Sequence, residues 1–145
     1  MSEKMRLTVR SGPPSGMLAT QDTKAGALQS GEPRAMGGRN LAPNSIEMLL
    51  ASWAGCLVAS ARLAALEHGL DLGALHAEAE AEIKPRSVAG DRTAQAGLLS
   101  AVACFTLSGP VEDLPWLCQE IEARSPVSQT LRCTGGPPAI EISRA

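Results

Sequence analysis

The chain has 145 residues, a formal net charge of -2 and 44% hydrophobic residues. This composition is typical of one globular domain with a hydrophobic core, and the near-neutral charge does not indicate a nucleic-acid or anionic-membrane partner. Its aromatic residues are two tryptophans and one phenylalanine, too few to build the stacking platforms of single-strand binding proteins.

The targeting and cysteine patterns predict a soluble cytoplasmic protein. The first ten residues alternate charged and apolar side chains, unlike a secretory signal. The longest uncharged apolar run, residues 48–61, is shorter than the roughly 20 residues that span a bilayer. The four cysteines form no Cys-x-x-Cys pair, and only two histidines accompany them. We therefore expect free thiols, no metal site and no cofactor.

The N-terminal segment, residues 1–43, predicts a small sheet followed by a loop. Residues 5–10 alternate apolar and polar side chains, as a half-buried strand does. Weaker strand patterns occupy residues 17–20 and 25–29, and a glycine- and proline-rich loop covers residues 31–43. The segment has too few large apolar side chains to fold by itself, so we treat all 145 residues as a single domain.

A long apolar helix is predicted over residues 44–69. Asn44 is a favourable N-cap, Glu47 stands where a capping box places it, and Gly69 is a stop signal. At 1.5 Å per residue the helix is about 36 Å long, more than a domain of this size usually encloses, so we expect a second subunit to cover part of it. A thiol, Cys56, lies within its apolar stripe, which consists of Ile46, Leu49, Leu50, Trp53, Leu57, Ala61 and Ala64.

Residues 74–108 predict a β-hairpin. Residues 75–84 alternate alanine, leucine or isoleucine with charged or polar side chains, which indicates a strand with one solvent-exposed face. Because alanine and glutamate also favour helices, a helix remains an alternative for this segment. Residues 97–107 give a clearer strand, and the polar residues 85–95 between the two predict a loop.

Two helices within residues 113–131 and a final strand complete the predicted fold. The first helix, residues 113–124, has Asp113 as its N-cap, and Ser125 caps a second, shorter helix. Residues 139–143 predict the last strand. This element order is typical of an α+β fold with mainly antiparallel sheets around a long central helix.

Two separated segments resemble motifs of the OsmC/Ohr family, the osmotically induced and organic-hydroperoxide-resistance proteins. The first is a Gly-Gly pair at 37–38 followed by residues 42–56, which is similar to the family's helix entry and its Leu-Leu-Ala-x-x-Ala-Gly-Cys run. The second, residues 125–131, is Ser-Pro-Val-Ser-Gln-Thr-Leu, where the family has Cys-Pro-Val-Ser-x-Thr-Leu. Together with the element order, the resemblance covers nearly the whole chain.

The resemblance implies an entwined homodimer with two active sites at the interface, which reduces organic hydroperoxides with thiols. It places Cys56 at the position of the family's peroxide-attacking cysteine, whose thiolate is oxidised to a sulfenic acid. Ser125 occupies the position of the resolving cysteine, and a hydroxyl cannot form a disulfide. We therefore expect a small thiol or dithiol to act as the external reductant.

Two further positions differ from the pattern of the family. The activating arginine of the Ohr branch belongs in the loop at residues 12–15, where this chain has no cation, so Arg10 is the nearest candidate. The family's glutamate belongs ten residues before Cys56, where this chain has Ile46, and Glu47 is one residue further along. The nine residues from Glu47 to Cys56 turn the helix through about 900°, so Glu47 points to the opposite side of the helix from Cys56. We therefore expect only Glu47 of the partner subunit to reach Cys56.

Each candidate also has an ordinary structural interpretation. Cys56 would serve equally as a small buried hydrophobe in a core helix, and Glu47 and Ser125 would serve as helix caps. Cys118 or Cys133 would act as a displaced resolving thiol if its Cα lay within about 7 Å of that of Cys56.

The leading hypothesis is an OsmC/Ohr-like one-cysteine organic hydroperoxide reductase in which Cys56 attacks the peroxide. The alternative is a non-catalytic dimer of the same fold that binds an apolar small molecule at its interface. The two differ in one observable property, the oxidation of Cys56 by an alkyl hydroperoxide.

Overall fold

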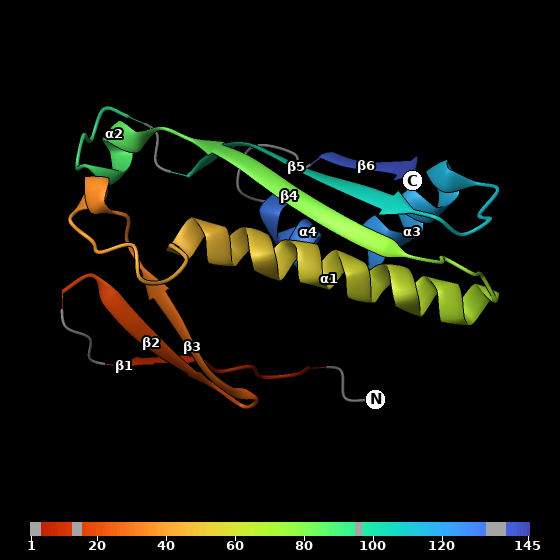
Figure 1. Ribbon diagram of the computed structural model, residues 1–145, viewed down its shortest axis with the longest axis horizontal. Coiled ribbons are helices and arrows are strands. Elements are labelled where there is room, and N and C mark those ends of the chain that lie inside the picture. Colours follow the sequence, from red (N-terminus) through yellow and green to blue (C-terminus); the bar gives the residue numbers. More distant parts are fainter. Residues whose placement is uncertain (1–3, 13–15, 95–96, 133–138) are drawn as a thin grey trace. The chain divides into compact units, whose positions relative to one another are not determined.

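The structure is a computed structural model that describes residues 4–12, 16–94, 97–132 and 139–145. The chain divides into two compact units, Met1–Leu49 and Leu50–Ala145 (Figure 1). The boundary falls within the long helix, a few residues after its start. Each unit has its own three-stranded sheet.

The N-terminal unit contains an antiparallel sheet in the order β1-β2-β3 and a single turn of 3-10 helix, η1. Its elements are β1 (Arg10–Gly12), β2 (Leu18–Thr23), β3 (Gly26–Gly31) and η1 (Arg34–Met36). The strands predicted at residues 17–20 and 25–29 are therefore confirmed, and η1 lies in the segment predicted to be a loop.

The strand predicted at residues 5–10 is wrong for all but its last residue. Residues 5–9 form no strand, and the apolar side chains Met5, Leu7 and Val9 are exposed. The register pairs Arg10 with Asp22, and β2 ends one residue later at Thr23. The preceding residues thus have no strand beside them in this unit, and alternation alone does not form a strand without a hydrogen-bonding partner.

The helix α1 (Ser45–His68) has the ends that its sequence predicts. Asn44 Oδ1 accepts the N–H groups of Ile46 and Glu47 at 2.9 Å each, and Glu47 Oε2 accepts the N–H of Asn44 at 2.7 Å. This reciprocal arrangement is a capping box. At the other end Gly69 has a left-handed φ of 65°, which allows the Leu70 N–H to reach the Ala65 carbonyl at 2.9 Å and end the helix.

Within the C-terminal unit one face of α1 is in the core and another is exposed. Trp53, Leu57, Ala61 and Ala64 are completely buried, whereas Leu66 is 82% exposed. By length and composition α1 is also apolar enough to cross a membrane, a test that the core helices of soluble proteins pass as well. The C-terminal unit by itself does not cover this exposed apolar face of α1.

The sheet of the C-terminal unit has the order β4-β5-β6 and comprises β4 (Leu75–Ile83), β5 (Leu98–Leu107) and β6 (Ala139–Arg144). The antiparallel β4–β5 hairpin is confirmed, so the strand interpretation of residues 75–84 is correct and the helical alternative is wrong. A short helix, α2 (Pro85–Val88), lies in the connection that was predicted to be a loop.

The final strand β6 is confirmed, and it pairs with β5 in a parallel orientation. The described strand pairs are otherwise antiparallel. A parallel neighbour requires the chain to cross back over the sheet, and α3 (Leu114–Arg124) and α4 (Pro126–Arg132) lie in that crossover. Asp113 caps α3 as predicted, because its Oδ1 accepts the Trp116 N–H at 2.9 Å.

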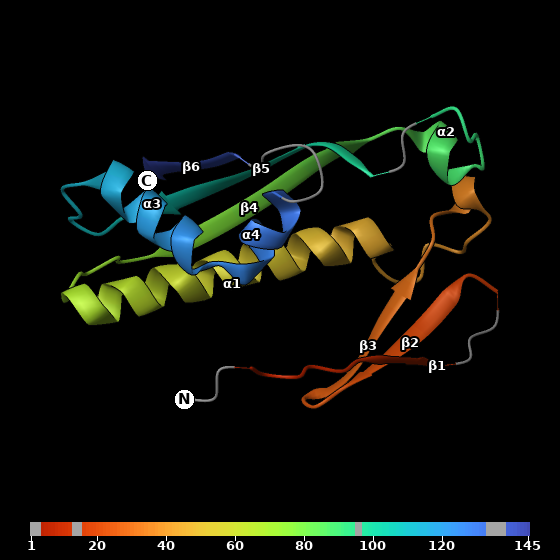
Figure 2. The same ribbon diagram turned by 180° about the vertical axis from the view of Figure 1, so that it is seen from behind.

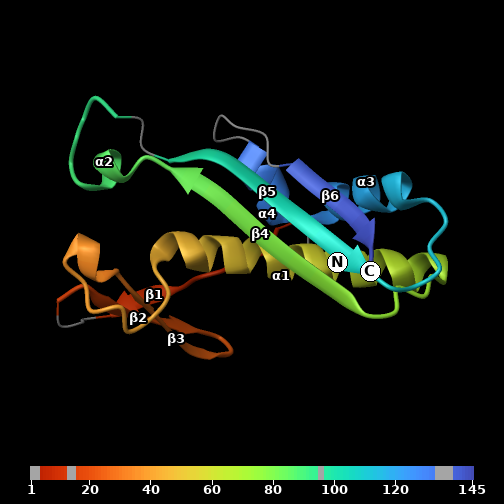
Figure 3. The ribbon, with the colours of Figure 1, turned by 45° about the horizontal axis from the view of Figure 1, so that its top comes forward.

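The helices α1, α3 and α4 all lie on one face of this sheet (Figures 2 and 3). The face of β5 toward them is buried, and α3 contributes Leu117 and Ile121 to the same core. The opposite face is solvent-exposed and carries Glu78, Glu80 and Glu82 of β4. The fold thus brings α1 together with the junction between α3 and α4. The buried residues of β5 are Ala101, Ala103, Phe105 and Leu107.

Candidate functional site

The two sequence motifs meet at a contact between Cys56 and Ser125. Ser125 lies between α3 and α4, 69 residues along the chain from Cys56, and its Oγ donates a hydrogen bond to Cys56 Sγ at 3.3 Å. Ser125 is completely buried, whereas Cys56 is partly exposed. The sulfur therefore lies at the edge of the core, where a buried group contacts it on one side and part of the residue remains accessible to solvent.

Ser125 is held in place by the helices that it joins. Its N–H donates to the Glu122 carbonyl at the end of α3, at 3.2 Å. Its Oγ accepts the N–H of Ser128 at 3.2 Å, which caps the first turn of α4. The predicted capping role of Ser125 is therefore confirmed, and it coexists with the contact to Cys56.

Ser128 connects this junction to the core of α1. Its Oγ donates to Ser125 Oγ at 2.9 Å and accepts the indole N–H of Trp53 at 2.8 Å. Trp53, Ser125 and Ser128 are each completely buried. A buried polar group without a hydrogen bond would cost about 1–3 kcal/mol, so the bond from Trp53 to Ser128 helps to fix α4 against α1.

A guanidinium group also joins α3 to α1 beside the site. Arg124 Nη2 contacts Glu67 of α1 at 2.6 Å and Glu120 of α3 at 2.8 Å. The hydrogen bonds to Glu120 and then to Glu67 raise the pKa of Arg124. The pair with Glu67 links the end of α3, directly before Ser125, to the last turn of α1, whereas the pair with Glu120 lies within α3. This cation is paired with carboxylates and makes no hydrogen bond to Cys56.

Ser60 and Glu47, two polar residues of α1, have partners other than the sulfur of Cys56. The hydroxyl of Ser60 donates to the backbone carbonyl of Cys56 at 2.9 Å and not to its sulfur. The carboxylate of Glu47 accepts the Asn44 N–H, so its capping role is confirmed. Arg10 is exposed at the start of β1, and both Arg10 and Glu47 belong to the N-terminal unit. Residues 13–15 of the loop expected to hold an activating arginine lie outside the described residues.

The sulfhydryl of Cys118, one candidate for a displaced resolving thiol, is hydrogen-bonded to the sheet. Its sulfhydryl donates to the Ile140 carbonyl of β6 at 3.4 Å. Burial, and then the charge of Glu122, raise the pKa of Cys118, so its neutral form is favoured. Cys56, Cys104 and Cys118 are all free thiols. Cys133, the other candidate for a displaced resolving thiol, lies outside the described residues.

Cys104 lies on the exposed face of the sheet, in register with Glu78 on one side and Glu141 on the other. Its Sγ is 3.9 Å from Glu141 Oε2. Desolvation, followed by the negative charges of Glu141, Glu80 and Glu78, raises the pKa of Cys104. This thiol is thus accessible, and its surroundings favour the protonated, less nucleophilic form.

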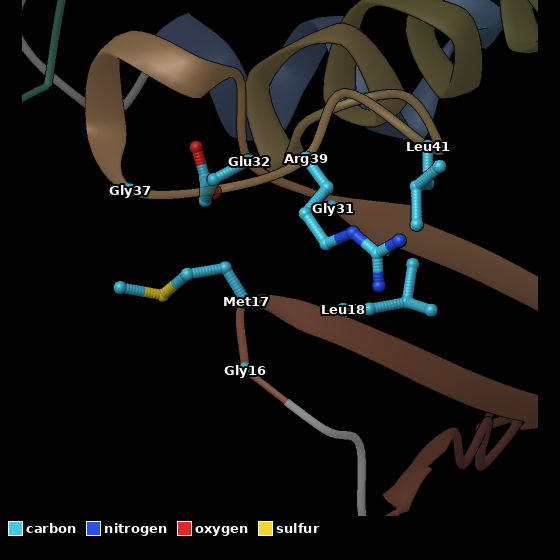
Figure 4. A pocket seen from close by; sticks show the side chains of 8 residues that line it. All are labelled: Gly16, Met17, Leu18, Gly31, Glu32, Gly37, Arg39 and Leu41. Atoms are coloured by element: carbon cyan, nitrogen blue, oxygen red, sulfur yellow. The ribbon is translucent and has the colours of Figure 1, made fainter.

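The N-terminal unit contains an open pocket next to the Gly-Gly motif (Figure 4). The side chain of Arg39 extends into it between Leu18 and Leu41. A side chain at Gly38 would collide with the backbone of Glu32, so the second glycine of the motif allows the two chain segments to lie side by side. The pocket is lined by Gly16, Met17, Leu18, Gly31, Glu32, Gly37, Arg39 and Leu41.

The residue pattern of a known family covers most of the chain. Residues 37–138 match the family model of OsmC-like proteins. This chain belongs to the OsmC family. Both motifs, from the Gly-Gly pair to Cys56 and from Ser125 to Leu131, lie within the matched part of this OsmC-family chain. A comparison with curated proteins found no match.

Solved structures show the same fold at low sequence identity. An OsmC-like protein from Mycoplasma pneumoniae is 15% identical with a TM-score of 0.79, covering 100% of this chain and 99% of that one. An organic hydroperoxide resistance protein from Elizabethkingia anophelis, with thiocyanate bound, is 16% identical with a TM-score of 0.76, covering 98% and 99%. A putative organic hydroperoxide resistance protein from Vibrio cholerae, with captopril bound in one active site, is 17% identical with a TM-score of 0.69, covering 98% and 95%.

The sequence did not reveal how Ser128 and Trp53 take part in the site of this OsmC-family protein. One signal was available, because a tryptophan in a buried helical stripe needs an acceptor for its indole N–H. Which acceptor it finds depends on a contact between two residues that are 75 positions apart in the sequence, and the spacing of residues does not predict such a contact. Within the described ranges, no group of three or more His, Cys, Asp or Glu side chains is arranged to hold a metal ion.

The raised pKa values of Cys104 and Cys118 predict an alkylation profile shifted to high pH. A raised pKa lowers the thiolate fraction at every pH below it, so both thiols should react with iodoacetamide more slowly than N-acetylcysteine between about pH 7 and 9. Peptide-level mass spectrometry after timed quenching measures each site separately. Glu141→Gln should bring the Cys104 profile partly back toward that of the free thiol. Profiles equal to that of N-acetylcysteine would show that these environments do not protect the thiols.

The hydrogen bond between Ser125 and Cys56 predicts that a thiol in place of the hydroxyl forms a disulfide. Ser125→Cys should form an intramolecular disulfide with Cys56 under mild oxidant, because the two side chains are already in contact. Non-reducing peptide mapping detects the cross-linked peptides. Ser128→Cys is the matched control, since the hydroxyl of Ser128 is bonded to Ser125 and to Trp53 rather than to the sulfur. If neither variant cross-links to Cys56, the two motifs are not juxtaposed as described.

Proposed function

We propose that this OsmC-family protein is a one-cysteine organic hydroperoxide reductase in which Cys56 is the attacking thiol. The contact of Ser125 Oγ with Cys56 Sγ supports this proposal more than any other observation, because it joins the two positions at which the family resemblance expects the attacking and resolving cysteines. Two of the structural relatives are named as organic hydroperoxide resistance proteins. The proposal also places the protein in the cytoplasm, where small thiols are available.

The first step oxidises the sulfur of Cys56. The thiolate attacks the terminal oxygen of the hydroperoxide ROOH, the new S–O bond forms, and the O–O bond breaks. The leaving alkoxide takes up a proton and departs as the alcohol ROH. Cys56 is left as a sulfenic acid, so the sulfur has lost two electrons and the peroxide has gained them. The proposal requires the peroxide to reach the sulfur, and Cys56 as a residue is partly exposed.

An external thiol must then reduce Cys56, because Ser125 provides a hydroxyl where a second sulfur would be needed. A small thiol condenses with the sulfenic acid, releases water and forms a mixed disulfide. A second thiol attacks that disulfide, restores the thiol of Cys56 and departs as an oxidised dithiol or disulfide. In the unreacted protein the sulfhydryl of Cys118 is bonded to β6 rather than to Cys56, so the proposal assigns the second sulfur to an external thiol.

We further propose that the protein acts as a homodimer in which a second copy covers the exposed face of α1. Small side chains at Gly55 and Ala59 would allow two such helices to approach closely, and Leu63 and Leu66 are 58% and 82% exposed on the same helix. A second copy fits this face because an isologous contact pairs identical surfaces. In such a dimer Glu47 of the partner subunit, together with Arg10, is a secondary candidate for polarising the peroxide.

The reductase proposal predicts rapid, thiol-reversible oxidation of Cys56. On addition of tert-butyl hydroperoxide in the presence of dimedone, Cys56 should acquire the adduct of a sulfenic acid, because the thiolate displaces the alcohol. With a small monothiol in place of dimedone, the same peptide should carry a mixed disulfide, and peroxide should be consumed repeatedly. Peptide-level mass spectrometry and a peroxide assay measure the two outcomes.

Two variants control this experiment. Cys56→Ser should reduce peroxide consumption to the rate of the buffer with thiol alone, whereas Cys104→Ser should leave it unchanged, since Cys104 lies on the opposite face of the sheet. If Cys56 stays unmodified under excess peroxide, the reductase proposal fails. The non-catalytic alternative, a dimer that binds an apolar small molecule, would then account better for the fold.

The dimer proposal predicts a dimer mass at micromolar concentration. Leu66→Glu should raise the dimer dissociation constant by more than roughly tenfold, because the dimer would bury an unpaired carboxylate on the face of α1. Leu66→Met keeps an apolar side chain and should remain dimeric. Light scattering coupled to size-exclusion chromatography gives both masses, and a monomer mass for the unmodified protein at this concentration would rule the proposal out.

A further inference from the structure

Four side chains form one continuous chain of hydrogen bonds that ends on the sulfur of Cys56. The indole N–H of Trp53 donates to Ser128 Oγ at 2.8 Å, Ser128 Oγ donates to Ser125 Oγ at 2.9 Å, and Ser125 Oγ donates to Cys56 Sγ at 3.3 Å. We propose that Trp53 and Ser128 are positioning residues whose bonds hold the hydroxyl proton of Ser125 on the sulfur of Cys56. This inference deepens the proposed reductase function and rests on it.

The direction of the chain follows from which groups can accept a hydrogen bond. An indole N–H is a donor only, so Ser128 Oγ must accept from Trp53, and its own proton is left to donate to Ser125. The backbone N–H of Ser128 is also a donor only, and it too is bonded to Ser125 Oγ. Ser125 Oγ therefore accepts twice and uses both of its lone pairs. Its single proton is left to donate to Cys56 Sγ.

Burial makes this direction stable. Trp53, Ser125 and Ser128 are completely buried, so reversing either of the two bonds that the serine hydroxyls donate would leave a hydroxyl proton without an acceptor inside the core. Each bond also polarises the next, because hydrogen bonds in a chain strengthen one another at low dielectric. The tryptophan at the far end thus determines the orientation of the hydroxyl that contacts the sulfur.

A hydroxyl held in this direction keeps a hydrogen-bond donor on the sulfur throughout the proposed reaction. A hydrogen bond to an ionised acceptor is roughly twice as strong as one between neutral groups. The Ser125 O–H would therefore stabilise the attacking thiolate of Cys56 and, after oxidation, the sulfenate. Ser125 would then be an active part of the one-cysteine site as well as the residue that prevents an internal disulfide.

The two indole N–H groups of the protein provide a direct test by NMR. Only Trp53 and Trp116 give indole signals, and Trp116 instead makes an edge-to-face ring contact with His68 at 4.8 Å. Cys56→Ala removes the terminal acceptor, so the Trp53 indole proton should move upfield as the chain weakens. The Trp116 signal should stay in place and serves as the internal control.

Trp53 lies three residues before Cys56 on the same helix, so a substitution at Cys56 could shift the Trp53 signal simply because it is near. A double-mutant comparison distinguishes such an effect from coupling through the chain of hydrogen bonds. Ser125→Ala interrupts the chain in its middle and keeps the bond between Trp53 and Ser128. In this background Cys56→Ala should no longer shift the Trp53 indole signal. A shift of the same size with and without the Ser125 hydroxyl would mean that the two ends are not coupled through it, and the inference would be overturned.

Kinetics provide the second measurement. Ser125→Ala should slow the oxidation of Cys56 by alkyl hydroperoxide roughly ten- to hundredfold, and Trp53→Phe or Ser128→Ala roughly two- to tenfold. Ser128→Thr keeps the hydroxyl, so in this variant Cys56 should be oxidised at the rate of the unmodified protein. Substitution of a residue that only stabilises the fold would lower the unfolding temperature. It would leave the rate of Cys56 oxidation unchanged at temperatures where the variant is folded.

The two proposals fail in different ways. A protein that consumes no peroxide but shows coupled indole shifts refutes the reductase function and supports the hydrogen-bond chain. A protein that consumes peroxide at the same rate with Trp53→Phe, and whose indole signal is not coupled to Cys56, refutes the positioning roles of Trp53 and Ser128. Coupled shifts together with slower oxidation support both proposals.

Discussion

The burial of the Trp53 indole is the constraint on which the geometry of the candidate site depends. Its side chain is completely buried, so its N–H needs an acceptor within the protein, and Ser128 provides it. That bond fixes the first turn of α4 against α1, and Ser125, three residues earlier, is brought to Cys56 as a result. A large apolar residue at position 53 without a donor would fill the same space, but it would not determine which way the serine hydroxyls point.

Local features of the fold could be predicted from the sequence, because the interactions that form them lie within a few residues. The caps at Asn44 and Asp113 and the stop at Gly69 depend on neighbouring backbone groups, and each is found where expected. The strand from residue 75 was correctly preferred over a helix, since its alternation matches one half-buried and one exposed face. The failed strand at residues 5–9 shows the limit, because its pattern required a partner strand that β2 does not extend far enough to supply.

The candidate site could be predicted only in part. The two motifs pointed to Cys56 and Ser125 through the family resemblance, and the structure brings these residues into contact. The bonds that support them could not be found from spacing, since Trp53 and Ser128 are 75 residues apart and Arg124 pairs with Glu67 across two helices. Such partners are set by how α1, α3 and α4 pack on the sheet. The parallel pairing of β6 was missed for the same reason, because it depends on the path of the crossover.

The row of carboxylates beside Cys104 has a consequence for how the protein would withstand oxidative conditions. A cysteine on an open sheet face is the group through which two molecules most easily become cross-linked, and cross-linked molecules aggregate. Glu78 and Glu141 flank this thiol in register, and their charges favour its protonated form, which exchanges with disulfides slowly. The acidic face would thus make Cys104 a poor site for cross-linking two molecules under peroxide, the condition in which the proposed chemistry of Cys56 would take place.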